Sequence, residues 1–218
     1  MRTKISWTDG VALVVLFLPL AYFIYLYPGL PQTVALHFNV KGEPDRWGNK
    51  SETWLPILML SVVALGVGLL VRFLPLIDPK KKVQYSEGTL IKLSYGLVLF
   101  LTVLNFMIVH ASQTGHFALG RGFFPVMGLF YVYLGNLFNN IKPNYFVGIR
   151  TPWTLENESV WRKTHHWGGR LWVIGGLTLA VTTFFWPKVA VFLTGTAILA
   201  LAPIIYSYVC YRQIQKTV

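Results

Sequence analysis

Charged residues are scarce in this sequence of 218 residues: Asp, Glu, Lys and Arg make up 12% of it, whereas 54% is hydrophobic. A typical soluble domain is about a quarter charged. So few charges could not cover a surface exposed to water, and the apolar residues fall into long blocks, unlike the periodic apolar positions of a soluble core. The mean hydropathy is +0.52. The sequence therefore predicts an all-α integral membrane protein.

Cysteine is almost absent, and so are the common catalytic signatures. The single cysteine, Cys210, excludes an intrachain disulfide framework and is expected to be a small packing residue. The sequence contains neither a His-Glu-x-x-His pair nor a nucleophile-elbow motif. We therefore assign no catalytic residue and no metal ligand, and we expect no cofactor.

Six blocks contain no Asp, Glu, Lys or Arg, and they approach the roughly 20 residues needed to cross the hydrocarbon of a bilayer. They are Val11–Tyr27, Trp54–Val71, Leu93–Ala111, Phe123–Ile141, Leu171–Trp186 and Val189–Tyr211. Aromatic residues, rather than a small-residue cleavage site, end the first block, so it is interpreted as a retained helix. About six transmembrane helices are predicted, the last two forming a tight helical hairpin.

The positive charges predict the orientation of these helices. Fourteen of the nineteen Lys and Arg residues fall at the two termini and in the second and fourth loops, whereas five fall in the other loops. Cytoplasmic loops accumulate Lys and Arg, so both termini are predicted to be cytoplasmic. This topology accounts for the net charge of +11, and direct nucleic-acid binding is not expected. The basic segment Asp78–Lys82 is interpreted as a cytoplasmic linker that anionic lipid headgroups would hold at the surface, and a plain topology determinant is the favoured interpretation of it.

Two long loops, one predicted on each face of the membrane, carry most of the polar motifs. They divide the chain into three regions. Residues 1–53 hold the first helix and the outer loop, residues 54–141 hold helices two to four, and residues 142–218 hold the inner loop and the last two helices.

The outer loop contains a short segment with strand character, Thr33–Asn39. At a period of two, Val34, Leu36 and Phe38 would share one face. A turn with Gly42 at its last position is expected to follow.

Polar residues of the outer loop allow two interpretations. In one, a rigid outer platform presents His37, Asn39 and Asp45 to a partner. In the other, Asn39 and Asp45 cap turns while His37 satisfies a backbone group. The spacing alone favours the second interpretation.

The inner loop is expected to be irregular at first and helical later. Gly148 and Pro152 should keep its first part from being helical. Arg150 lies among aromatic neighbours, where a guanidinium should stack on a ring or bind a carboxylate or phosphate in a fork. A helix is expected from Asn157, which would act as its N-cap, with Glu158 favoured in the first turn by the helix dipole.

On that helix Glu158, Arg162 and His165 follow at i, i+4 and i+7 and should share a face. Two interpretations remain open. The helix would be either an interfacial amphipathic helix, anchored by Trp161 and Trp167 and carrying an ordinary Glu158–Arg162 surface pair, or a cytoplasmic docking surface.

A metal-dependent membrane enzyme is one alternative function. An outer zinc site would use His37 and Asp45 together with His110 or His116. His165 and His166 are adjacent, so on a helix they point about 100° apart and cannot both face one ion.

A small-solute transporter is a second alternative. The six blocks contain no charged residue of the kind that relays protons or binds coupling ions, which weakens this interpretation. Asn105, Asn136 and Asn139 could line a polar path, but hydrogen bonding between helices is the expected role of such residues.

Two motifs resemble the SdpI family of bacterial membrane proteins. One runs from His37-Phe-Asn through Gly42 and Pro44-Asp45 to Trp47-Gly48, and is similar to the family's N-terminal domain of unknown function. The other runs from Asn144 through Gly148-Ile-Arg-Thr-Pro-Trp-Thr-Leu155 to Trp161, Thr164-His165 and Gly168-Gly169. Together with the six helices, the resemblance covers nearly the whole chain.

The resemblance implies an immunity and signal-transduction protein of the bacterial plasma (inner) membrane. The family's namesake protects its cell from a secreted peptide toxin that collapses the membrane potential, and it holds a cytoplasmic repressor at the membrane. The implied partners are therefore membrane lipids, a peptide toxin and a cytoplasmic repressor. The implied binding residues are His37, Asn39, Gly42, Pro44 and Asp45 in the outer loop, and Asn144, Gly148, Arg150, Thr151, Pro152, Trp153, Trp161, Thr164 and His165 in the inner loop.

Overall fold

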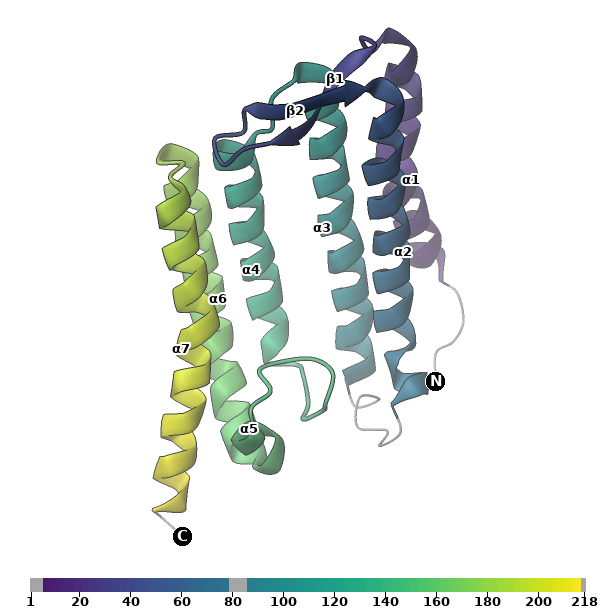
Figure 1. Cartoon of the computed structure of the whole chain (residues 1–218). Coiled ribbons are helices and arrows are strands. Elements are labelled where there is room, and N and C mark those ends of the chain that lie inside the picture. Colours follow the sequence, from purple (N-terminus) through teal and green to yellow (C-terminus); the bar gives the residue numbers. More distant parts are fainter. Residues whose placement is uncertain (1–5, 79–85, 217–218) are drawn as a thin grey trace. The chain divides into compact units, whose positions relative to one another are not determined.

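A computed structural model describes residues 6–78 and 86–216 of the chain, which fold into two compact units (Figure 1). The first unit comprises residues 1–71 and 94–119, and the second comprises residues 72–93 and 120–218. The basic residues Lys80, Lys81 and Lys82, for which we predicted a position at the headgroups, lie outside the described residues.

The first unit consists of three helices and a β-hairpin. Its helices are α1 (Trp7–Leu26), most of α2 (Trp54–Ile77) and most of α3 (Glu87–Thr114). The hairpin, formed by β1 (Thr33–Phe38) and β2 (Pro44–Asn49), joins α1 to α2, and short 3₁₀ turns flank it at η1 (Tyr27–Gly29) and η2 (Lys50–Thr53).

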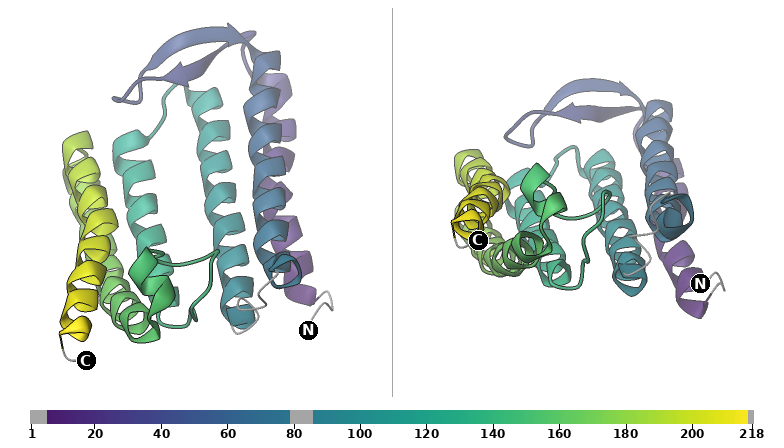
Figure 2. Two further views of the ribbon diagram at one scale, coloured as in Figure 1. Left: turned by 60° about the horizontal axis from the view of Figure 1, so that its bottom comes forward. Right: turned by 90° about the horizontal axis from the view of Figure 1, so that it is seen from below.

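The second unit holds the rest of the helices and the inner loop. Besides the end of α2 and the start of α3, it contains α4 (Phe124–Phe138), α5 (Pro152–Glu156), α6 (Glu158–Phe185) and α7 (Val189–Gln215). The π-helical turn η4 (Leu119–Phe123) leads into α4. Figure 2 shows α5 and the inner loop at the end of this unit where α4 ends and α6 begins.

The all-α membrane class is confirmed, with a small hairpin added. Among the described residues, five helices are long and apolar enough to cross a membrane: α1, α2, α3, α6 and α7. The sixth predicted span corresponds to α4, which has 15 residues and is preceded by the five residues of η4. At about 1.5 Å per residue, α4 alone is shorter than the hydrocarbon thickness of about 30 Å. The count of six and the cytoplasmic termini therefore stay predictions.

The predicted helix at the end of the inner loop and the predicted fifth span are one continuous helix, α6, of 28 residues. The side chain of Asn157 accepts a hydrogen bond from the Val160 backbone, so the predicted N-cap is confirmed. The span prediction began later, at Leu171, because Arg162, Lys163 and Arg170 interrupt the apolar run. Charged residues end an apolar block but do not break a helix.

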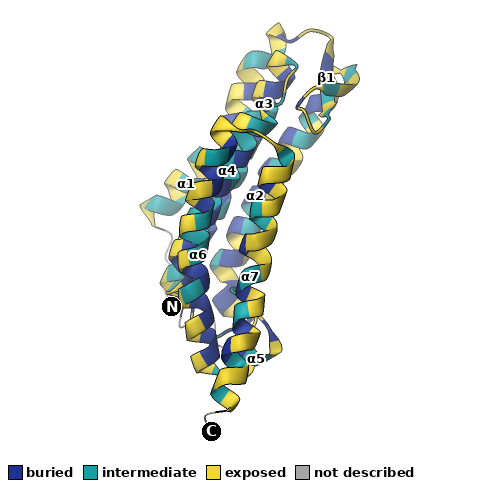
Figure 3. Ribbon diagram, turned by 90° about the vertical axis from the view of Figure 1, so that its left-hand side faces the viewer, coloured by how far each residue is buried: buried dark blue, intermediate teal, exposed yellow. Residues whose placement is uncertain are grey.

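Many apolar side chains along the candidate spans face outward. Figure 3 shows broad exposed stretches on α7, where Leu193, Leu201 and Ile205 are exposed. In water such a surface would be unfavourable, but lipid tails cover it in a membrane. This exposure accounts for the scarcity of charge in the sequence.

Glycines allow α4 and α6 to approach at two levels. A Cβ added to Gly176 on α6 would lie 2.6 Å from the Gly128 carbonyl oxygen of α4, and one added to Gly135 would lie 2.8 Å from the Gly169 carbonyl oxygen. Real Cβ atoms do not come so near to backbone atoms. The two helices therefore pack backbone to backbone, as small residues permit in membrane helices.

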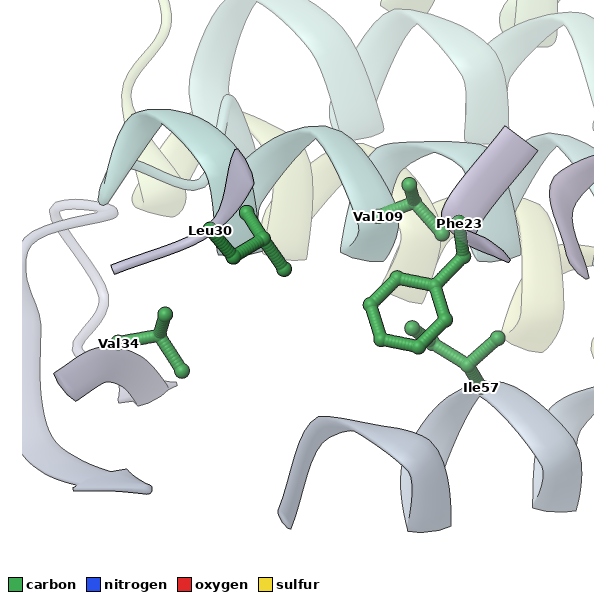
Figure 4. Close-up of a cluster of buried hydrophobic side chains, with 5 residues drawn as sticks. All are labelled: Phe23, Leu30, Val34, Ile57 and Val109. Atoms are coloured by element: carbon green, nitrogen blue, oxygen red, sulfur yellow. The ribbon is translucent and has the colours of Figure 1, made fainter. Parts of the chain in front are cut away.

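The hairpin is held to its helices by an apolar cluster. Phe23 of α1, Ile57 of α2 and Val109 of α3 pack with Leu30 and with Val34 of β1 (Figure 4). All five side chains are buried.

The alternation predicted for β1 is broken by a bulge. The pairing of β1 with β2 shifts register between Ala35 and His37, so Val34 and Ala35 are both buried. A bulge inserts one residue and changes which side chains share a face. The predicted face is kept in part: Leu36 packs against the same cluster as Val34, and Phe38 is partly buried, but Ala35 of the opposite face is buried as well.

Candidate functional site

Two loops, one in each unit, hold the residues that we predicted to bind partners. The outer loop lies in the first unit and contacts the residues that follow the C-terminal end of α3. The inner loop lies in the second unit, where the Lys142 backbone N–H donates to Ser86 Oγ, next to the N-terminal start of α3.

Asn39 organises the turn of the outer hairpin. Its side-chain oxygen accepts hydrogen bonds from the backbone N–H groups of Lys41 (2.8 Å) and Glu43 (3.1 Å). The Gly42 N–H donates to the Asn39 carbonyl, which confirms the predicted turn. An Asn that accepts bonds from the backbone two residues on is a common turn former. Asn39 thus has the turn-forming role that the spacing favoured.

Gly42 fixes the turn against the segment after α3. Its φ of +79° belongs to the left-handed region, which disfavours side chains. A Cβ at this position would overlap the carbonyl oxygen of Phe117, whose own N–H donates to the Gly42 carbonyl at 3.0 Å. Only glycine fits both the conformation and the close approach.

His37 and Asp45 face each other across the hairpin, and Pro44 begins the second strand. The Nδ1 of His37 lies 2.5 Å from a carboxylate oxygen of Asp45, and both side chains are largely exposed. Asp45 therefore binds His37 instead of capping a turn, and His37 binds a side chain rather than a backbone group.

The outer zinc alternative lacks a third ligand in this structure. Within residues 6–78 and 86–216, no group of three or more His, Cys, Asp or Glu side chains could hold a metal ion. His110 and His116, which we considered as third ligands, are not part of such a group with His37 and Asp45.

A mostly apolar pocket of about 420 Å³ lies beneath the hairpin in the first unit. Residues of β1 and the following turn form one side, and Pro56 of α2 and Ile108 of α3 form the other. His37 and Asn39 also line it, so these two candidate residues border an apolar space.

Replacing Gly42 with alanine should detach the hairpin turn from the segment after α3. The left-handed conformation costs roughly 1 kcal/mol with a side chain, and the overlap with Phe117 adds to it. We expect faster hydrogen–deuterium exchange at residues 39–44 in the purified protein. Gly29→Ala is the matched control, because nothing lies within 4 Å of a Cβ there. Equal exchange in both variants would contradict this role of Gly42.

Asn144 folds the first part of the inner loop around itself. Its side-chain oxygen accepts hydrogen bonds from the N–H groups of Phe146 and Val147, both at 2.8 Å. Its side-chain nitrogen donates to the carbonyls of Lys142 (2.8 Å) and Val147 (3.1 Å). The side chain is 2% exposed. All of its polar atoms are used within the loop, so Asn144 acts as a scaffold.

His165 joins the inner loop to α6. Its Nε2 accepts a hydrogen bond from the Ile149 N–H at 2.9 Å, and its Nδ1 lies 2.9 Å from the Trp161 carbonyl oxygen. A carbonyl only accepts, so the proton is on Nδ1 and the ring is neutral in this arrangement. His165 is buried, whereas Glu158 and Arg162 are exposed. It nevertheless lines one pocket together with Glu158 and Arg162, so the expected i, i+4, i+7 face is confirmed, with His165 at its buried edge.

Trp161 and Gly148 complete the contact between loop and helix. The Trp161 ring stacks on His165 with centroids 4.0 Å apart, and its Nε1 donates to the Ile141 carbonyl at 2.8 Å. Gly148 has φ +112°, and a Cβ there would overlap His165. Trp161 is 1% exposed, so it packs within the protein and is not a headgroup anchor.

A five-residue helix, α5, begins at Pro152, where a non-helical chain was expected. Proline suits the first position of a helix, because its missing N–H has no partner there in any case. Thr151 is the N-cap and accepts a hydrogen bond from the Thr154 N–H at 3.3 Å. The Nε1 of Trp153 donates to Ser207 Oγ of α7 at 2.7 Å, which ties α5 to the last helix.

The other two predicted inner residues differ in their surroundings. Arg150 is exposed, and its guanidinium donates to the Tyr145 carbonyl rather than to a carboxylate. Thr164 is fully buried, and its hydroxyl makes no hydrogen bond within the described part of the chain.

Several residues of the inner loop were missed by the sequence analysis. The Thr154 hydroxyl contacts the carbonyls of Ile149 and Thr151, each at 3.0 Å, and is fully buried. Lys142 and His166 line a pocket with Arg162 on the same side of α6. The i, i+4, i+8 spacing of Glu158, Arg162 and His166 could have identified this face.

Asn105 has the predicted interhelical role in the first unit. Its side-chain nitrogen donates to the Ile57 carbonyl (3.1 Å) and to Ser61 Oγ (3.0 Å), both on α2. Asn139, the C-cap of α4, likewise joins two helices, because its side-chain oxygen lies 3.1 Å from His166 Nδ1 of α6 in the second unit.

Comparisons with known proteins match both loops. Residues 140–207 match the SdpI/YfhL protein family, and residues 14–60 match a domain of unknown function, DUF1648. The chain is 24% identical over 182 residues to the protein named "Immunity protein SdpI" of Bacillus subtilis (strain 168), and the match covers 80% of this chain and 81% of that protein. No solved structure matches the chain significantly. The family resemblance of the two motifs is confirmed.

Proposed function

Because the chain carries an SdpI/YfhL family region after its DUF1648 region, we propose that it is an immunity and signal-transduction protein of the bacterial inner membrane. In this role it crosses the membrane several times. It protects its cell from a membrane-active peptide toxin and holds a repressor at the cytoplasmic face. The proposed role is one of binding rather than catalysis.

The similarity to the immunity protein over four fifths of the chain carries this proposal, and the two matched family regions, residues 14–60 and 140–207, contain the outer and the inner loop. Each loop is held by hydrogen bonds and close contacts of its own. The outer turn is fixed by Asn39 and Gly42, and the inner loop is fixed by His165 and Asn144. A rigid loop loses little conformational entropy when a partner binds, which suits a recognition surface.

The two loops differ in what they would bind. The mostly apolar pocket beneath the outer hairpin, which His37 and Asn39 help to line, would bind an apolar peptide segment. The inner loop presents exposed Arg150 and Pro152 beside Trp153, which is half-buried. A surface with an arginine and an aromatic residue is typical of protein–protein contacts. We therefore propose the toxin contact at the outer loop and the repressor contact at the inner one.

Deletion of the gene in its source bacterium tests the immunity role. Cells without the protein should survive less well, and should lose membrane potential, when treated with the peptide fraction of their own culture medium. A plasmid copy of the gene should restore both survival and membrane potential. A copy that carries His37→Ala and Asp45→Ala should restore them less. Survival and membrane potential that do not differ between deleted and intact cells would refute the immunity role.

Measurement of transcription tests the proposed repressor role. Peptide treatment should raise transcription of a small set of genes in intact cells. In cells that carry a Trp153→Ala copy, which loses the bond to Ser207 and disturbs α5, these genes should be expressed without treatment. Transcription that is the same in both strains would count against repressor binding while leaving the immunity role standing.

A further inference from the structure

The second unit contains a pocket lined by Trp161 and His165 and by several charged residues, none of which takes part in the contacts proposed above. It has a volume of about 250 Å³, several times the roughly 30 Å³ of a water molecule in the liquid. One wall is the end of α4 and the turn that follows, including Asn139 and Lys142. The other wall is the start of α6, with Glu158, Arg162 and His166.

Positive charge predominates in this pocket. Lys142 and Arg162 line it from opposite walls, and Glu158 is the carboxylate among its lining residues. Within the described residues 6–78 and 86–216, the side chains of Glu158 and Arg162 take part in neither an ion pair nor a hydrogen bond, unlike the pairs His37–Asp45 and Arg46–Glu52 of the outer loop. The surface pair expected between Glu158 and Arg162 is therefore not formed, and the guanidinium is available to a ligand.

The walls of the pocket are fixed before any ligand binds. The Lys142 N–H donates to Ser86 Oγ at 2.9 Å, and the Lys142 carbonyl accepts from Asn144 at 2.8 Å. The Ile141 carbonyl accepts from Trp161 Nε1 at 2.8 Å, which joins the turn to α6. The backbone that carries the lysine is thus tied on both sides. Such preorganisation reduces the cost of binding.

His166 adds a further polar group to the same side. It follows Arg162 by one helical turn, and its Nδ1 lies 3.1 Å from the side-chain oxygen of Asn139. An amide oxygen only accepts, so Nδ1 carries the proton and the ring is held in place on the α6 wall.

From these contacts we propose that Lys142 and Arg162 form a binding site for a phosphate group, either of a lipid headgroup or of free phosphate. Guanidinium groups bind phosphate oxygens in a fork, and a lysine ammonium adds a point charge. The pocket lies where α6, a candidate membrane span, begins, and the ends of spans lie at the depth of lipid phosphates. Glu158 limits the strength of the site by repelling an anion.

Binding to the purified full-length chain in an uncharged detergent tests the site. In one arm phosphatidylglycerol is added in mixed micelles and adducts are counted by native mass spectrometry. In the other arm inorganic phosphate is titrated by calorimetry. Arg162→Gln should weaken binding about tenfold in the arm that contains the true ligand, because it removes a charge-assisted hydrogen bond. If Arg162→Gln weakens binding in the lipid arm, the ligand is a lipid headgroup. If it weakens binding in the phosphate arm, the ligand is free phosphate.

Two further variants make the result decisive. Lys163→Gln is the matched control, since Lys163 is the neighbouring exposed cation and does not line the pocket. Glu158→Gln should strengthen binding, a change that a misfolded protein would not show. Equal weakening by Lys163→Gln, or no effect of Arg162→Gln in either arm, would overturn the proposal, as would unchanged or weaker binding in Glu158→Gln.

Discussion

Replacing Gly176 with leucine is expected to separate α4 from α6 and to destabilise the second unit by about 3 kcal/mol. A Cβ at this position would already lie 2.6 Å from the Gly128 carbonyl oxygen and 2.9 Å from the Val132 backbone nitrogen. Both neighbours are backbone atoms, which cannot rotate aside as a side chain can. The helices must therefore move apart, and the contact between Gly135 and Gly169 further along the same pair should loosen as well.

This loss of stability is measured by unfolding the protein in mixed micelles that contain increasing fractions of sodium dodecyl sulfate. Circular dichroism and tryptophan fluorescence report the unfolding. Gly66→Leu serves as the control, because Gly66 lies on α2 and nothing is within 4 Å of a Cβ there. That control should be neutral or slightly stabilising, since leucine favours a helix by roughly 0.8 kcal/mol over glycine. If both variants unfold at the same detergent fraction, the close packing of α4 and α6 does not contribute to stability.

Replacing His165 with leucine is expected to release the inner loop from α6. The change leaves the Ile149 N–H without its acceptor and removes the stacking on Trp161. A buried donor without a partner costs about 1 to 3 kcal/mol. Hydrogen–deuterium exchange at the Ile149 amide should accelerate by about 30-fold, the equivalent of roughly 2 kcal/mol.

The adjacent histidine provides the control for this experiment. His166 is exposed and pairs with the Asn139 side chain rather than with the loop. His166→Leu should therefore leave exchange at residues 144–150 unchanged. Comparable acceleration in the two variants would mean that the loop responds to any change at the start of α6, and that the bond to His165 has no special role.

Membrane character and the main helices could be predicted from sequence because they follow from composition. An apolar block needs only length to be recognised, and Asn157 with Glu158 is a local capping signal whose partners lie within one turn. The turn at Gly42 is local as well. In each case the residues that determine the structure are neighbours in the sequence.

Features that depend on distant partners could not be predicted. The inward turn of His165 depends on Ile149, and the bulge in β1 depends on its pairing with β2. The short helix at Pro152 was missed for another reason. Proline was interpreted as a helix breaker, whereas at the first helical position it favours a helix. The outer and inner binding roles of the loops stay predictions, because a rigid loop shows its geometry but not its partner.

The continuity of α6 has a mechanical consequence for the inner loop. Gly176, where the helix touches α4 deep in the second unit, is eleven residues from His165, which corresponds to about 16 Å of unbroken helix. A helix without an internal proline resists bending over that length. A force that displaced α6 near Gly176 would turn or slide the whole helix, and the loop that is hydrogen-bonded to His165 would have to move with it. Such a displacement would shift the surface of the inner loop without unfolding either the helix or the loop.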